Sequence, residues 1–159
     1  MRLTFSTDYA LRLLMLMGLE SDRLVSVEEG ADRLGISKNH LMKVAYQLGQ
    51  AGYLENARGR NGGLRLGNAP RQIVVGEVVH KIESDFAVVE CENPEGYCRI
   101  EPCCTLRSAM AKAVQAFLEK LDQYTLGLTQ ERIPRFAPYG VGQERLRIDW
   151  ARVRRTGFL

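Results

Sequence analysis

Cysteine is confined to one segment of this 159-residue chain, where it occurs as Cys91, Cys98, Cys103 and Cys104. Thiols are therefore not used as ordinary small core residues elsewhere, and this segment needs its own explanation. In a reducing cytosol, clustered thiols act as metal ligands or redox groups more often than as structural disulfides. The cluster of cysteines thus indicates metal or iron-sulfur ligation.

The spacing of the thiols distinguishes only in part between the possible kinds of site. Six residues separate Cys91 from Cys98 and five separate Cys98 from Cys104, which leaves Cys103 over. The pattern lacks the paired C-x2-C knuckles and the nearby histidine of common zinc sites. A loop with proline and glycine suits an iron-sulfur cluster, which needs four ligands. From spacing alone, an iron-sulfur cluster, zinc, redox thiols and unliganded cysteines all stay open.

The same pattern speaks against an enzyme. A small thiol oxidoreductase would need a C-x2-C pair or a cysteine beside a poised base, and the sequence has neither. The N-terminus has no apolar run long enough for export or membrane spanning, because charged residues interrupt it at Arg2, Asp8, Arg12 and Glu20. We expect a cytoplasmic protein without catalytic residues.

Three helices are predicted ahead of the cysteine segment. Ser6 can cap a helix whose apolar residues recur at helical spacing up to Gly18. Ser26 can cap a short second helix that ends at Gly35, and Ser37 can cap a third that runs to about residue 49. The tight link at residues 35–37 is typical of a helix-turn-helix.

A basic hairpin is predicted after the third helix. Residues 53–57 and 64–66 have strand character, and the Asn-Gly-Gly between them supplies the backbone conformations that a hairpin needs. Four arginines and no acids lie between residues 58 and 71, which favours phosphate contact or, alternatively, a merely solvated loop. A helix-turn-helix followed by such a hairpin is a winged helix, so the predicted fold class is mainly α with a small β wing.

In a winged helix, the exposed face near the start of the third helix enters the major groove of double-stranded DNA. Lysine suits phosphate or guanine, and asparagine can bond bidentately to adenine, although a solvated polar face would look similar. His80 is expected to be a surface or packing residue. The candidate DNA-binding residues are Lys38, Asn39, His40 and Lys43 of this helix, with Gln47 one turn on, and Arg58, Arg60 and Asn61 of the wing.

A long amphipathic helix is predicted from Thr105 to Leu128, because apolar residues step by three or four throughout. In so small a protein, the same helix of a second subunit could cover this apolar stripe, which predicts a homodimer; burial within one chain is the alternative. The predicted domains are a winged helix-turn-helix over 1–80, a cluster-binding loop over 81–104, a dimerisation helix over 105–129 and a basic C-terminal tail over 130–159.

Several segments of the sequence together carry a family resemblance. They are Ile36-Ser37-Lys38-Asn39-His40-Leu41, Gln47-Leu48 with Ala51-Gly52-Tyr53, Arg58-Gly59-Arg60-Asn61-Gly62-Gly63 with Arg65-Leu66-Gly67, and Cys104-Thr105-Leu106-Arg107. These segments resemble the iron-sulfur winged-helix repressors, the family that includes IscR, and within it the nitric-oxide-sensing NsrR branch. The resemblance covers about residues 1 to 129.

The resemblance implies a ligand set. Cys91, Cys98 and Cys104 would hold an iron-sulfur cluster, 4Fe-4S in preference to 2Fe-2S, and Asp8 of the partner subunit would be the fourth ligand. An acid in the first turn of a helix is also favoured by the helix dipole alone. Two features depart from the family pattern, namely a first gap that is one residue longer than usual and the extra thiol of Cys103. Arg107 stands where IscR-like members carry a histidine, which favours the NsrR branch.

The implied function is that of a cluster-dependent transcriptional repressor which senses nitric oxide by nitrosylation of the cluster and then releases its operator. A carboxylate is a harder and weaker ligand to iron than a thiolate, so the iron bound by Asp8 would be the site of attack. The alternative is an iron- or redox-responsive winged-helix regulator with a different cluster or with zinc.

Overall fold

The first three helices begin and end where the sequence provides capping residues. In the computed structural model, which describes residues 2–59, 62–92, 96, 98 and 104–130, these helices are α1 (Phe5–Leu19), α2 (Val27–Leu34) and α3 (Lys38–Gln50). The side chains of Ser26 and Ser37 cap α2 and α3 as predicted, and Gly35 ends α2 in the left-handed conformation, with φ of 64°. The cap of α1 is Thr4, so the prediction of Ser6 is wrong.

The wing is an antiparallel hairpin of β1 (Leu54–Ala57) and β2 (Gly63–Leu66), in which Leu54 pairs with Leu66 and Ala57 with Gly63. Leu64 also exchanges two backbone hydrogen bonds with Val25, in the segment that leads into α2. Gly63 is required there, because a Cβ at this position would lie 2.9 Å from the Val25 carbonyl oxygen. The hairpin is thereby fixed to the helix-turn-helix.

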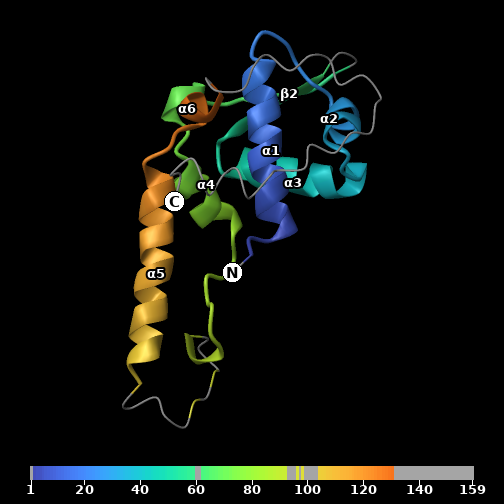
Figure 1. Cartoon of the computed structure of the whole chain (residues 1–159). Coiled ribbons are helices and arrows are strands. Elements are labelled where there is room, and N and C mark those ends of the chain that lie inside the picture. Colours follow the sequence, from blue (N-terminus) through green and yellow to red (C-terminus); the bar gives the residue numbers. More distant parts are fainter. Residues whose placement is uncertain (1, 60–61, 93–95, 97, 99–103, 131–159) are drawn as a thin grey trace, which may run out of the picture.

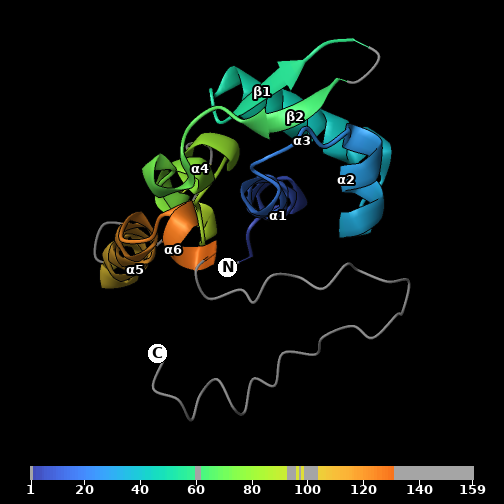
Figure 2. The ribbon, with the colours of Figure 1, turned by 90° about the horizontal axis from the view of Figure 1, so that it is seen from above.

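A core shared by α1, α3 and the hairpin holds this part together. Apolar residues of α1 pack against those of α3, and α1 also contacts α2, β2 and α4 (Val75–Ile82). Seen from above, α1 lies at the centre of the winged helix with α2, α3 and the wing around it (Figure 2). The largest buried side chains include Leu13, Leu14, Met17, Leu41, Leu48 and Val25.

Four ion-paired residues fix the end of α1 to α2. Arg23 binds Glu20 at 2.6 Å, and Arg33 binds Glu20 at 2.8 Å and Glu29 at 3.3 Å. Hydrogen bonds from Arg23, supported by Arg33, hold the pKa values of Glu20 and Glu29 below the ordinary value of a glutamate. The same contacts raise the pKa of Arg23, because its charged form donates these bonds.

The second half of the chain comprises 3-10 turns η1 (Pro70–Gln72) and η2 (Glu90–Glu92), α4, α5 (Thr105–Asp122) and α6 (Leu126–Gln130). The prediction of a single helix over residues 105–128 is therefore wrong. Val75 N donates to the Tyr124 carbonyl and Leu126 N donates to the Ile73 carbonyl, both at 2.8 Å. The helix ends because backbone groups at 124–126 bind the link between η1 and α4 instead.

Helix α5 extends away from the winged helix and leaves most of its surface uncovered (Figure 1). Only Leu118 of its residues is buried within the chain, and Leu106 is 56% exposed. None of the described helices is both long and apolar enough to cross a membrane. The fold is thus a winged helix-turn-helix with a protruding helix, and it confirms the predicted fold class.

Candidate DNA interface and thiol loop

The predicted recognition residues lie on the exposed face of α3. Leu41, Val44, Ala45 and Leu48 fill the core side of the helix, which leaves the opposite side to solvent. Ser37 Oγ accepts from the backbone nitrogen of His40, so the side chains of the first turn start from a fixed cap. Exposed on this helix are Lys38, Asn39, His40, Lys43 and Gln47. The structure therefore brings the predicted α3 residues onto one polar surface.

Tyr46 belongs to the same surface, although it is not among the DNA-binding residues predicted from the sequence. Its side chain is 69% exposed, although tyrosine is a large ring that usually buries most of its area. It follows Lys43 by three residues and Asn39 by seven, so the helical period alone could have placed it on the recognition face. A ring and hydroxyl at this point can contact both apolar and phosphate groups of a duplex.

Two of the candidate cations differ in their partners. Lys38 Nζ lies 3.0 Å from Glu28 Oε1 in the first turn of α2, whereas Lys43 has no ion-pair partner within the described part of the chain. His40 lies against Tyr9 of α1, with ring centroids 6.3 Å apart. The recognition helix is thus in direct contact with the first helix through His40.

The wing presents part of its predicted set. Arg58 is exposed at the end of β1, and Gly59 beside it has a φ of 117°, which glycine adopts without strain. Arg65 pairs with Glu55 across the hairpin at 2.6 Å. Arg60 and Asn61 lie outside the described residues, so their role in DNA contact stays a prediction.

Three of the four cysteines fall within the described residues. Cys91 lies in η2, Cys98 follows in the loop, and Cys104 is the N-cap residue of α5. All three are free thiols and are partly buried. Cys103 lies outside the described residues, so its predicted status as the spare thiol stays untested.

The geometry of the loop brings the thiol-bearing segments toward one end of α5. The η2 turn packs against α5, and Cys104 begins that helix without a side-chain capping bond (Figure 1). Glu92 accepts hydrogen bonds from the backbone nitrogens of Val88 and Val89, which holds the turn around Cys91. Free thiols are the ligands that an iron-sulfur cluster uses. Still, the described residues of one chain hold no converged group of three potential metal ligands.

Asp8 lies in the first turn of α1, where it binds Arg12 one turn further along the helix. The shortest distance between the two side chains is 2.7 Å, and both are partly exposed. Within the chain, Asp8 is not grouped with the described thiols. Its assignment as a ligand from the partner subunit therefore stays a prediction.

A winged helix with an exposed polar recognition helix and a basic wing is a DNA-binding unit. Residues 3–129 match the Rrf2 family, described as iron-dependent transcriptional regulators, and the chain belongs to this family. It is a transcriptional regulator and not an enzyme.

Individual relatives agree with this assignment. The chain is 52% identical over 128 residues to the HTH-type transcriptional regulator NsrR of Bacillus licheniformis (strain ATCC 14580), a match that covers 79% of this chain and 90% of the relative. Among solved structures, IscR of T. potens matches with a TM-score of 0.68 at 21% identity, over 88% of this chain and 94% of that one. CymR, the global cysteine regulator of B. subtilis, matches with a TM-score of 0.67 at 22% identity, over 84% and 99%. The two structures support the fold alone.

Proposed function

We propose that this protein is a cytoplasmic transcriptional repressor that depends on an iron-sulfur cluster and releases its operator when nitric oxide attacks that cluster. The observation that carries the proposal is the set of three free thiols, two of them in segments packed at one end of α5, in a chain 52% identical to NsrR. Thiolates are the ligands that iron-sulfur clusters require.

Cys91, Cys98 and Cys104 would hold the cluster, 4Fe-4S in preference to 2Fe-2S, and Asp8 of the partner subunit would complete the ligand set. When bound, the cluster supplies an iron that binds nitric oxide. Asp8 is suited to the open position, since a carboxylate binds iron more weakly than a thiolate does. Because Arg12 pairs with Asp8 in the single chain, the carboxylate would have a partner when it is not bound to iron.

The homodimer is proposed from the surface of α5. Leu106 is exposed, and Met110 and Phe117 are only partly covered, so an apolar face runs along the helix. A second copy of α5 can bury this face with two-fold symmetry. The two recognition helices would then enter successive major grooves of a partly palindromic, A·T-rich operator, about 34–36 Å apart.

Asp8 is also well placed to affect DNA binding. The neighbouring residue Tyr9 contacts His40 at the start of α3. A change in the position of the first turn of α1 would therefore alter the contact with the recognition helix. We infer that loss of the Asp8 bond weakens the operator complex through this contact.

The test is an anaerobic preparation of the full chain. Visible absorption with iron and sulfide analysis should reveal a cluster, and stepwise addition of nitric oxide should bleach it in parallel with loss of operator binding. A zinc-loaded protein, or operator binding that is indifferent to nitric oxide, would overturn the proposal. A zinc-loaded protein would favour a winged-helix regulator that responds to another signal.

An Asp8→Ala variant separates assembly from signalling. The three thiols remain and water or a small thiol can fill the open position, so the cluster should still assemble. Operator affinity should fall and the response to nitric oxide should change. Identical titrations for the variant and the wild type would remove Asp8 from the ligand set.

A further inference from the structure

Glu83 is a buried carboxylate at the end of α4. It joins the start of α1 to the segment that leads into the thiol loop. Glu83 is 9% exposed, and its Oε2 atom accepts three hydrogen bonds. Thr7 Oγ1 donates at 2.6 Å, the backbone nitrogen of Thr4 at 3.0 Å and Thr4 Oγ1 at 3.2 Å. We call this group the Glu83 clasp.

The clasp connects elements that are distant in sequence. Glu83 ends α4 and begins the stem of the thiol loop, whereas Thr4 caps α1 and Thr7 lies in its first turn, directly before Asp8. A buried charge is costly unless it is hydrogen-bonded, and an apolar residue would serve better if packing were the only need. The clasp therefore fixes where α1 begins relative to the loop.

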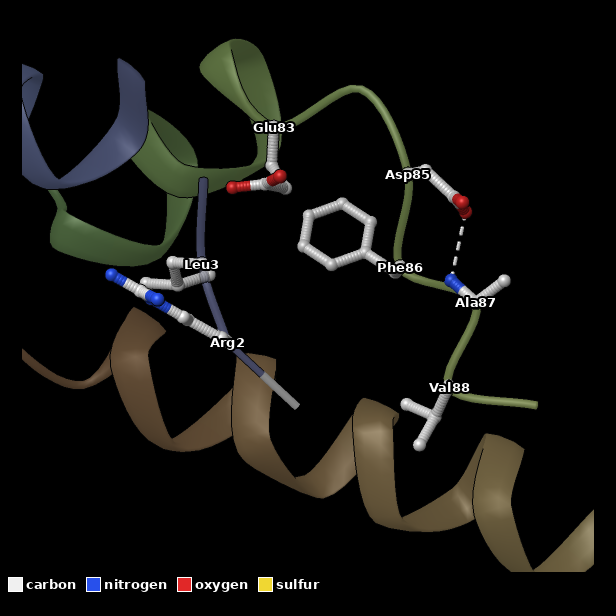
Figure 3. A pocket seen from close by; sticks show the side chains of 7 residues that line it. All are labelled: Arg2, Leu3, Glu83, Asp85, Phe86, Ala87 and Val88. Carbon is white, nitrogen blue, oxygen red and sulfur yellow. Dashed lines mark hydrogen bonds between the residues drawn. The ribbon is translucent and has the colours of Figure 1, made fainter. Parts of the chain in front are cut away.

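Beyond the clasp, the two segments are less closely joined. A cavity of about 130 Å³ lies between the start of the chain, at Arg2 and Leu3, and the loop stem from Glu83 to Val88 (Figure 3). Phe86 lines this cavity and also contacts His80 of α4, with ring centroids 5.4 Å apart. Among the described residues near this cavity, the clasp supplies the hydrogen bonds that join the start of α1 to the stem.

A row of rings continues from the clasped end of α1 to the recognition helix. Phe5 lies 5.9 Å from Tyr9, and Tyr9 lies 6.3 Å from His40 of α3, measured between ring centroids. Ring pairs at such distances have preferred geometries, so a shift of one ring changes the position of the next. Movement of the first turn of α1 would therefore disturb the contact between Tyr9 and His40 on the surface proposed to read DNA.

We propose that Glu83 is a positioning residue that couples the state of the thiol loop to the recognition helix through Thr7 and the Tyr9–His40 contact. The proposal rests on the proposed function, because the loop must have two states to report. The Glu83 side chain binds Thr4 and Thr7 and is not proposed to contact DNA or to hold the cluster. It sets the place of α1, which carries Asp8 and Tyr9.

The functional test compares operator affinity of the cluster-free and cluster-loaded proteins. Coupling free energies between sites typically correspond to about 5- to 150-fold in affinity. Glu83→Ala should bring the ratio of the two affinities close to one, while iron content and visible absorption stay at wild-type levels. Glu83→Gln should retain much of the ratio, because an amide oxygen can still accept from Thr7 and Thr4. Glu77→Ala, which removes an exposed acid from the same helix, is the charge-matched control.

Thr7→Val identifies the route. Valine keeps the shape of the buried side chain and removes only the hydroxyl donor. If the clasp acts through this bond, Thr7→Val should lower the ratio by itself and should have little further effect in the Glu83→Ala background. Additive effects of the two substitutions would mean that Glu83 does not act through Thr7, and would overturn the proposed route.

A second readout uses the cluster-free protein alone. The chain has only two histidines, His40 and His80, so ring NMR signals are easily assigned with a His80→Gln variant. Glu83→Ala should shift the His40 signals, because the position of Tyr9 over that ring changes, and Glu77→Ala should not. Unchanged His40 signals in Glu83→Ala would overturn the proposal.

The outcomes separate this proposal from the proposed function. If wild-type affinity for the operator is the same with and without the cluster, the proposed function fails. If the wild type shows a clear ratio and Glu83→Ala keeps it, only the clasp fails. Loss of the cluster in Glu83→Ala, or an equal fall of both affinities with a lower melting temperature, would assign Glu83 to assembly or to stability and would equally refute the positioning role.

Discussion

The cationic side chains of the proposed DNA surface differ in whether they are already paired. Glu28 holds Lys38 and Glu55 holds Arg65, while Lys43 and Arg58 have no ion-pair partner in the part of the chain that the structure describes. A phosphate must compete with the carboxylate for a paired cation, but not for a free one. Free cations should therefore contribute more to the affinity for DNA.

Lys43→Ala should weaken operator binding and lower the salt dependence by about one unit of slope, since one phosphate contact is lost. Glu28→Gln should strengthen binding by less than about fivefold, because exposed ion pairs are worth at most about 1 kcal/mol. Gel-shift titrations across a salt series measure both effects. An unchanged slope in Lys43→Ala would take this lysine away from the phosphates.

The four cysteines should differ in their importance for cluster assembly. Single replacement of Cys91, Cys98 or Cys104 by alanine should abolish a stable cluster, because each removes one of three thiolates. Cys103→Ala should leave it largely intact and is the matched control. Iron and sulfide analysis of the four variants decides the matter. If Cys103→Ala loses iron and Cys104→Ala keeps it, the third ligand has been assigned to the wrong neighbour.

Helix ends show which elements the sequence could predict. The caps at Ser26, Ser37 and Gly35 are local, since each bond closes within a few residues, and the structure confirms all three predictions. Thr4 replaces the predicted Ser6, and it also binds Glu83, 79 residues away. The end of α5 likewise depends on backbone bonds to residues 73 and 75. Apolar periodicity carries no information about such long-range partners.

The ion-paired junction between α1 and α2 predicts a pH-dependent stability. The pKa values of Glu20 and Glu29 lie below the ordinary value of a glutamate because Arg23 and Arg33 donate hydrogen bonds to them. Carboxyl groups of this kind stabilise the fold above the unfolded-state pKa, and that contribution is lost as the pH falls through the folded-state pKa.

Arg23→Ala should therefore lower the free energy of unfolding near neutral pH by a small amount, because exposed ion pairs contribute little to stability. The difference from the wild type should shrink as the pH falls through the lowered pKa values of Glu20 and Glu29, where these carboxyl groups become protonated in the folded wild type as well. Thermal unfolding of the cluster-free proteins at several pH values tests this. A difference that is independent of pH would mean that Arg23 acts by packing alone.

In the whole molecule, neither the sequence nor the structure of a single chain determines which residues of two subunits form one site. The resemblance names Asp8 and three cysteines as one ligand set, but the described residues of one chain do not bring them together. Asp8 is instead paired with Arg12. Which residues share a site between subunits depends on how two copies pack, and neither motif spacing nor the fold of one subunit determines that. The predicted domain boundaries at 80, 104 and 129 also stay predictions.

The position of α5 relative to the winged helix depends on a close approach at Gly76. A Cβ at this residue of α4 would overlap the side chain of Asp122 and would lie 2.8 Å from the Asp122 backbone nitrogen. Rotation of a side chain cannot relieve a clash with backbone, so the end of α5 would have to move. Because α5 carries the proposed dimer surface and α4 leads to the thiol loop, this movement would change how the two recognition helices are spaced.

Gly76→Ala should accordingly destabilise the protein by about 1–3 kcal/mol, the usual cost of overpacking, and should weaken binding to an operator of native half-site spacing more than binding to a single half-site. Gly49→Ala is the matched control, because a Cβ there meets only the Leu54 carbonyl oxygen at 3.8 Å and alanine favours the helix. Thermal unfolding and binding to the two DNA fragments measure the effects. If Gly76→Ala loses stability but binds both fragments as the wild type does, the α4–α5 contact supports the fold without setting the geometry of the dimer.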